Sequence, residues 1–212
     1  MEHDSLAAIE EKKLAQQLLS RPADRSMLLN IARIPNDACV FLEIPLQDAP
    51  GQVKGDIDLL VCAPGRAGAA IAIQVKRIKV GSNAFHSGKP NKLEKIKEGV
   101  WQTNDLTRIG FSQVYLYLLV SVDSRERNAG QLSYAGMTPE LRTTIAQTIA
   151  ERINDLDRRA GLVLFDFVQP MDYAPLDGSW WGGTELRRLA QEVAQSSDVT
   201  AWVSQVMQGP AF

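Results

Sequence analysis

Two strand-like runs of the chain carry the residue types that bind a cation beside a phosphate. The run GDIDLLV contains Asp56 and Asp58, and the run IAIQVK contains Gln74 and Lys76. Because side chains alternate across a strand, each pair lies on one face of its run. The intervening APGRAGAA has turn chemistry, so a hairpin centred near Arg66 predicts Asp58 opposite Gln74 and Asp56 opposite Lys76.

Directly opposed Cβ atoms in such a hairpin lie about 4.5–5.5 Å apart. The patch would therefore combine two carboxylates, an amide and an ammonium group. This combination suits a hard divalent cation, which prefers oxygen ligands, and it could stabilise negative charge on a phosphate.

The elements around this patch predict an α/β protein with a mixed central β-sheet flanked by helices. The strands 38–46, 56–62 and 70–77 should be consecutive and antiparallel, with the strand 113–122 packed in the centre, because runs this apolar need helices on both faces. In the helix expected at 91–110, Trp101 is placed on the apolar side. The periodicity predicts further elements: helices at 4–20, 23–34, 139–159, 184–195 and 199–207, and a strand at 161–168.

Composition narrows the function classes. The chain has 212 residues, of which 45% are hydrophobic, so we expect one domain over 1–212. Its formal net charge of -2 is not that of a protein that coats nucleic acid. The chain has only two cysteines, which form no CxxC pair, and only two histidines. This composition argues against a zinc site. No signal peptide or membrane-length apolar run is present, which predicts a cytoplasmic protein without membrane contact.

The GDIDLL run followed by IQVK resembles the PD-(D/E)XK nuclease superfamily, which has a restriction-endonuclease-like core. In that family an Asp on one strand and a (Glu/Asp)-x-Lys on the next bind the metal and the attacking water. Asp58 matches the Asp, Gln74 the acidic position and Lys76 the Lys. The neutral Gln74 is a departure, although a Gln-x-Lys form is known in the methyl-directed restriction endonuclease branch. The resemblance covers 38–122, and the additional α/β elements of 123–212 lie outside it.

The resemblance implies a magnesium site, with manganese as a substitute. Asp58 would anchor the ion, Gln74 would offer a carbonyl oxygen, and Glu43 or Asp56 would supply the second acid. Lys76 would position the water or stabilise charge on the phosphorus. The expected catalytic residues are thus Asp58, Gln74, Lys76 and Glu43.

Plainer interpretations of the same residues stay open. An Asp opposite a Lys is an ordinary cross-strand pair of a half-exposed hairpin. Glu43 could be the exposed position of an edge strand, and Asp56 could only orient Lys76.

A basic segment follows the motif and predicts a surface that tracks phosphates. Its expected nucleic-acid contacts are Lys79, Lys89, Lys92 and Lys95, and Gln102 on the following helix, where some family members place a Gln near the site. A solvated charged face and an exposed Gln are the alternatives. Trp180 and Trp181 could stack on a base, although a core or subunit-interface role is typical of such residues.

Three functions follow as expectations. The first is a metal-dependent nuclease that hydrolyses phosphodiester bonds of nucleic acid, with DNA as the expected substrate and phage defence or DNA repair as its setting. The second is a catalytically inactive nuclease-fold module that binds nucleic acid or a protein partner. The third is an α/β interaction protein in a larger complex. A homodimer is compatible with each of them.

Overall fold

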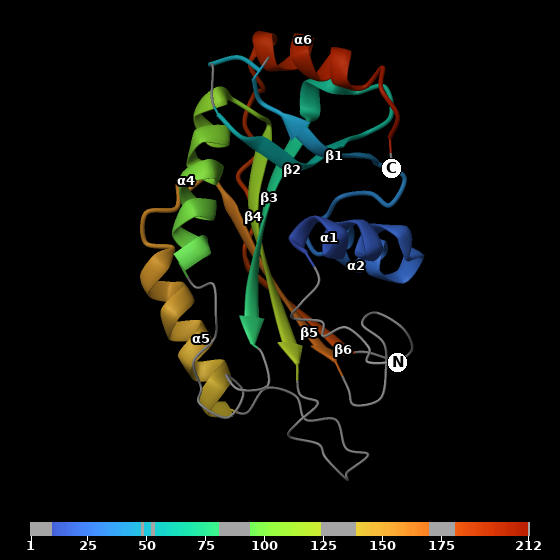
Figure 1. The fold of residues 1–212 in the computed structure, drawn as a ribbon. Helices are drawn as coiled ribbons and strands as arrows, with labels where there is room; N and C mark the ends of the chain where they lie inside the picture. Colours follow the sequence, from blue (N-terminus) through green and yellow to red (C-terminus); the bar gives the residue numbers. More distant parts are fainter. Residues whose placement is uncertain are drawn as a thin grey trace.

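The protein is a mixed α/β structure in which helices flank a six-stranded mixed sheet (Figure 1). This computed structural model describes residues 10–47, 49–51, 54–80, 94–123, 139–169 and 181–211. The strands lie in the sheet in chain order: β1 (Cys39–Pro45), β2 (Asp56–Cys62), β3 (Ile71–Val80), β4 (Gln113–Asp123), β5 (Gly161–Gln169) and β6 (Trp181–Arg188). The helices are α1 (Glu11–Ser20), α2 (Pro22–Asn30), a short 3-10 turn η1 (Ala67–Ala69), α4 (Glu94–Ile109), α5 (Pro139–Arg152) and α6 (Ser197–Val206).

The pairing of the strands agrees with the sequence-based expectation for the first half of the sheet. The strands β1, β2 and β3 are antiparallel neighbours, whereas β3, β4 and β5 are parallel. Parallel neighbours need crossover connections, and α4 and α5 provide them. The central position predicted for the strand at 113–122 is confirmed, because β4 lies between β3 and β5.

Helices cover both faces of the sheet, as the apolar strands require. The α1–α2 pair packs on one face, where Leu14 and Leu18 meet Val75, and Tyr115 and Tyr117 of β4 also belong to this core. The opposite face packs against α4 and α5 (Figure 1). A third apolar cluster lies where α6 joins the β1–β2 end of the sheet. No helix of the described residues is long and apolar enough to cross a membrane.

The helix predicted at 184–195 is wrong, because residues 181–188 form β6, which pairs antiparallel with β5. The following residues remain extended rather than helical. Their backbone groups bond to neighbouring loops, since Gln191 N donates to Arg159 O and Val193 N donates to Ser112 O. Partners distant in sequence thus override a local pattern that resembles a helix.

The placement predicted for Trp101 is also wrong. Trp101 is 64% exposed, and it is the one exposed large hydrophobic side chain among the residues that the structure describes. The inward face of α4 is formed by Ile96, Gly99, Val100 and Thr103 together with Leu106 and Thr107. Adjacent residues on a helix point about 100° apart. With Val100 directed inward, Trp101 is therefore turned away from the apolar face of α4.

Candidate functional site

The candidate site forms where β2 and β3 separate. Their ladder pairs Val61 with Ile71, Leu60 with Ala72 and Leu59 with Ile73, which is the register of a hairpin centred near residue 66. The described pairs end there, although β3 continues to Val80. Beyond Ile73, β3 therefore has a free edge on the side away from β4, as far as the described strands are concerned.

Two carboxylates take the place of a neighbouring strand along this free edge. Val75 N donates a 2.6 Å hydrogen bond to Asp58 Oδ2. Two residues further, Arg77 N donates a 2.6 Å hydrogen bond to Glu11 Oε2 of α1. Because a buried N–H without a partner is costly, both acids have a structural reason to point at β3.

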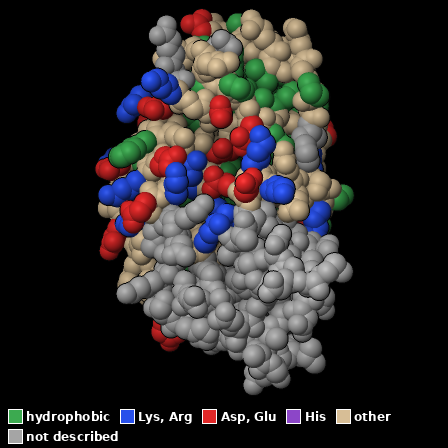
Figure 2. Space-filling view, in the orientation of Figure 1, with side chains coloured by type: hydrophobic (Ala, Val, Ile, Leu, Met, Phe, Trp, Pro, Cys, Tyr) green, Lys and Arg blue, Asp and Glu red, His purple; other side chains and the backbone are tan. Residues whose placement is uncertain are grey.

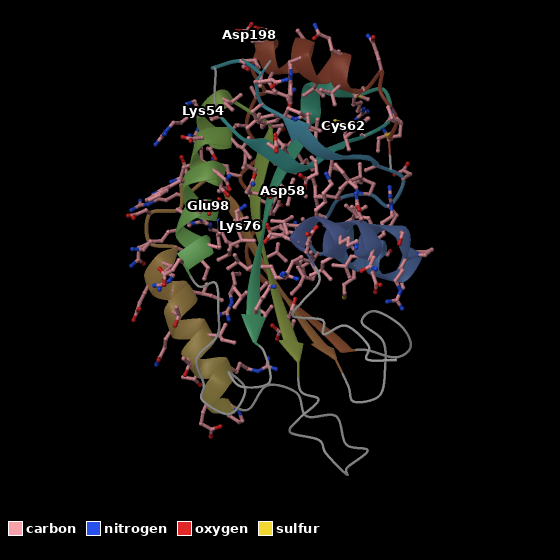
Figure 3. The ribbon with its side chains drawn as sticks, in the orientation of Figure 1. Lys54, Asp58, Cys62, Lys76, Glu98 and Asp198 are labelled. Atoms are coloured by element: carbon pink, nitrogen blue, oxygen red, sulfur yellow. The ribbon has the colours of Figure 1, made fainter. Side chains whose placement is uncertain are left out.

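The same two carboxylates hold Lys76. Its Nζ lies 3.9 Å from Asp58 Oδ2 and 4.0 Å from Glu11 Oε1, and the side chain is only 8% exposed. Close packing against α4 fixes its stem, because a Cβ added to Gly99 would lie 2.5 Å from Lys76 Cγ. Figure 3 shows Lys76 between Asp58 and Glu98 of α4, beside α1. The Lys76 ammonium also helps to lower the pKa of Glu98, after the larger effect of the hydrogen bond from Lys95.

Gln74 is buried on the same strand and is bonded to α4. Its Nε2 donates to Gln102 Oε1 at 3.2 Å, so the prediction that Gln102 lies near the site agrees with this geometry. Its carbonyl oxygen, Oε1, is buried and has no hydrogen-bond partner among the described residues. An oxygen left in this state is available to a cation.

Asp58 carries the strongest electrostatic perturbation of the site. Its pKa is raised from 3.8 to about 7, chiefly because burial penalises the charged form. Lys76 and the Val75 N–H oppose the increase in pKa, whereas the negative charges of Glu11 and Glu43 add to it. Burial therefore disfavours the charged form of this carboxylate despite the nearby ammonium, and a bound cation would favour the charged form.

Glu43 lies at an unusual point of β1. The pairs Leu42 with Leu59 and Ile44 with Ile57 place it across from Asp58 in the ladder register. Its φ of 52° is in the left-handed region, which is uncommon for a residue other than glycine. Its carboxylate lies 3.8 Å from Lys12 Nζ of α1, so Glu43 borders the site without contacting Lys76 in the described structure.

The other predicted residues lie further from this centre. Asp56 is exposed and lies across from Pro45 of β1, so the expected pairing with Lys76 does not form. Lys95 is paired with Glu98, and Lys79 is half-buried on β3. The predictions for Lys89, Lys92 and Trp180 fall outside the described residues, as does the side chain of Trp181.

Sequence reasoning missed Glu11. One signal in the chain points to it: Glu11 precedes Leu14 by three residues and Leu18 by seven, so it shares their core-facing stripe. An acid on the apolar face of an amphipathic helix needs a partner, and here the partners are Arg77 N and Lys76. The side chain of Arg77 is itself buried, and its Nε and Nη1 have no hydrogen-bond partner among the described residues.

Figure 2 shows acidic side chains gathered in the middle of this face, with Lys and Arg side chains beside them. Around the site, the carboxylates of Asp58, Glu11 and Glu43 lie near the ammonium groups of Lys76 and Lys12, and the Arg77 guanidinium interacts electrostatically with Glu11. No three Asp, Glu, His or Cys side chains in the described part of the chain are close enough to hold a metal by themselves. Other oxygens would have to complete a ligand set, and Gln74 Oε1 is the first candidate because it is buried and unpartnered.

The site therefore offers oxygen atoms of the kind that a small divalent cation prefers, one of them a buried amide oxygen without a partner among the described residues. Comparison of the chain with protein-family models gives no match. Comparison with curated proteins gives none either. Any assignment of function therefore depends on the geometry of the site.

Proposed function

We propose that the protein is a metal-dependent nuclease with a PD-(D/E)XK-type site on a restriction-endonuclease-like core. The observation that carries the proposal is the convergence of Asp58 from β2 and Lys76 from β3 at the point where the two strands separate. Gln74 lies on the same face of β3 as Lys76, since the two are two residues apart. Glu11 adds an acid from α1.

The residues that would hold magnesium or manganese are Asp58 and Gln74, with Glu11 or Glu43 as the second acid. When bound, such an ion lowers the pKa of a coordinated water and neutralises charge on the phosphate. The chain's own contribution is positional. Asp58 is held in place by the Val75 N–H, and Gln74 is oriented by Gln102.

Lys76 supplies the positive charge that the reaction needs. As negative charge grows on the phosphate oxygens, an ammonium group fixed beside them lowers the barrier without any rearrangement. Lys76 is suited to this role because Gly99 packs on its stem and two carboxylates hold its tip. Its burial also weakens the screening of that charge by water.

Cleavage of DNA by the purified protein tests the proposal. Wild type should cut with magnesium or manganese and should not cut with a chelator. Asp58→Ala and Lys76→Ala should abolish cutting, whereas Asp37→Ala, an exposed acid in the turn before β1, is the matched control. Full activity of Asp58→Ala would refute the site.

Binding without cutting by wild type, in the presence of metal, would instead identify a catalytically inactive module. The inactive module should also bind DNA equally well with Asp58 and with Ala at that position, which separates it from the nuclease. Electron paramagnetic resonance of bound manganese gives a readout independent of activity: binding should be lost in Asp58→Asn, which keeps an acceptor for the Val75 N–H.

A further inference from the structure

The exposed indole of Trp101 is the side chain whose position the fold explains least. Leaving a Trp in water forgoes the hydrophobic stabilisation that burial of its large apolar surface would give. Trp101 is 64% exposed on α4, a helix whose opposite face is firmly packed. Its exposure is thus a property of the outward face of a helix that is well packed on its inward face.

Among the described residues of α4, one cation lacks an ion-pair partner. The three acids of α4 are all ion-paired: Glu94 with Arg152, Glu98 with Lys95, and Asp105 with Arg108. Lys97 is exposed and has no ion-pair or hydrogen-bond partner among the residues that the structure describes. Lys97 precedes Trp101 by four residues, and residues at this spacing are neighbours on a helix, with Cβ atoms about 5–6 Å apart.

This surface lies directly beside the candidate site. Gln102, the next residue after Trp101, accepts the hydrogen bond from Gln74. Gly99, two residues before Trp101, packs against Lys76. At a rise of about 1.5 Å per residue, Trp101 lies at the same level of the helix as both contacts, on its outward side.

We propose that Trp101 and Lys97 bind one unstacked nucleobase and its flanking phosphate, so that the substrate is single-stranded nucleic acid. The inference rests on the proposed function and names its substrate class. An indole face accepts any base by stacking, and one lysine neutralises one phosphate. A base within a continuous duplex is already stacked on both sides, and it would first have to be unstacked at a cost in free energy.

A protein partner fits this surface less well. A stable interface buries about 800 Å² on each side, and its core is depleted of charged residues. Here the one exposed large hydrophobic side chain of the described residues shares α4 with three ion pairs, which a protein partner covering the helix would have to desolvate. A nucleobase needs only the face of the indole.

Fluorescence anisotropy of a labelled oligonucleotide tests the proposal. A single strand of about 12 nucleotides matches the site sizes of such proteins, and a chelator prevents cutting. Trp101→Ala should weaken single-strand binding about 5- to 150-fold while duplex binding changes little, because stacking on one aromatic ring is worth about 1–3 kcal/mol. Trp101→Phe, which keeps a ring, should restore most of the affinity.

The contribution of Lys97 is tested by a matched pair of lysine substitutions. Lys97→Ala should reduce the salt slope of single-strand binding by about 0.7, the value for one phosphate contact. Lys13→Ala removes the same charge from an exposed position of α1 and should leave the slope unchanged. Thermal unfolding of the Trp101 variants should match wild type, since the side chain is exposed.

Wild-type affinity in Trp101→Ala, or an equal loss for single strand and duplex, would overturn the inference. An absence of any DNA binding by wild type would overturn it as well. The proposed nuclease function fails separately: single-strand binding that depends on Trp101, in a protein that cuts nothing, would keep this inference and refute only the catalytic assignment.

Discussion

Replacing Asp58 by Asn should stabilise the protein at neutral and alkaline pH. Burial raises the pKa of Asp58 from 3.8 to about 7 in the folded protein. The folded state therefore binds a proton that the unfolded state has released between about pH 4 and pH 7. Stability must fall as the pH rises through this window and then stay level above it.

The size of the loss follows from the same pKa values. Each pH unit of difference between the folded and unfolded pKa corresponds to about 1.4 kcal/mol, so ionisation of Asp58 costs the folded state on the order of 4 kcal/mol above pH 7. About 3 kcal/mol of this appears between pH 5 and pH 8. Asn is neutral at every pH and its carbonyl oxygen can still accept the hydrogen bond from Val75 N–H.

Urea unfolding of wild type and Asp58→Asn, followed by circular dichroism at about pH 5 and about pH 8, measures this difference. The variant should gain about 3 kcal/mol relative to wild type on going from the lower to the higher pH. Asp37→Asn, which changes an exposed acid, should follow wild type at both values. Parallel pH profiles of wild type and Asp58→Asn would refute the reasoning, because burial of the carboxylate would then carry no penalty.

Three further substitutions probe the site. Gly99→Ala should lower the unfolding temperature and abolish cutting, because its Cβ would lie 2.5 Å from Lys76 Cγ and 3.0 Å from Leu116 Cδ1. This clash should outweigh the preference of about 1 kcal/mol that Ala has over Gly in a helix. A stable, active variant would contradict this packing. Gln74→Glu should tighten manganese binding in a titration calorimeter, and weaker binding would exclude Gln74 as a ligand. Glu11→Gln should lower the pKa of Asp58, because the Glu11 charge raises it. The upper end of the pH window of the stability loss should then move to lower pH, and an unchanged upper end would remove Glu11 from the site.

The sequence predicts the centre of the sheet well for a physical reason. The turn chemistry around Arg66 sets the register of β2 and β3, and a slip by one residue would turn every side chain to the wrong face. The observed pairing of Leu59 with Ile73 has the predicted register. What the local pattern cannot predict is where the ladder ends, because that depends on helices that pack against β3 from other parts of the chain.

The missed elements have the same origin. Glu11 lies 65 positions before Lys76, and only the docking of α1 on the sheet brings them together. Residues 181–188 form a strand because β5 pairs with them, even though the chain around them has a helical pattern. In both cases a contact between distant segments decides the outcome, and short-range periodicity carries no information about it.

The free edge of β3 links the stability of the fold to the chemistry of the site. Asp58 and Glu11 accept the N–H groups of Val75 and Arg77 that a neighbouring strand would otherwise bond. The same carboxylates approach the ammonium of Lys76, so each acid serves the backbone and the site at once. An alanine at either position would therefore leave a buried N–H without a partner as well as remove a charge. An amide keeps the acceptor and removes only the charge, which is why Asn and Gln, rather than Ala, separate the structural role of these acids from their chemical role.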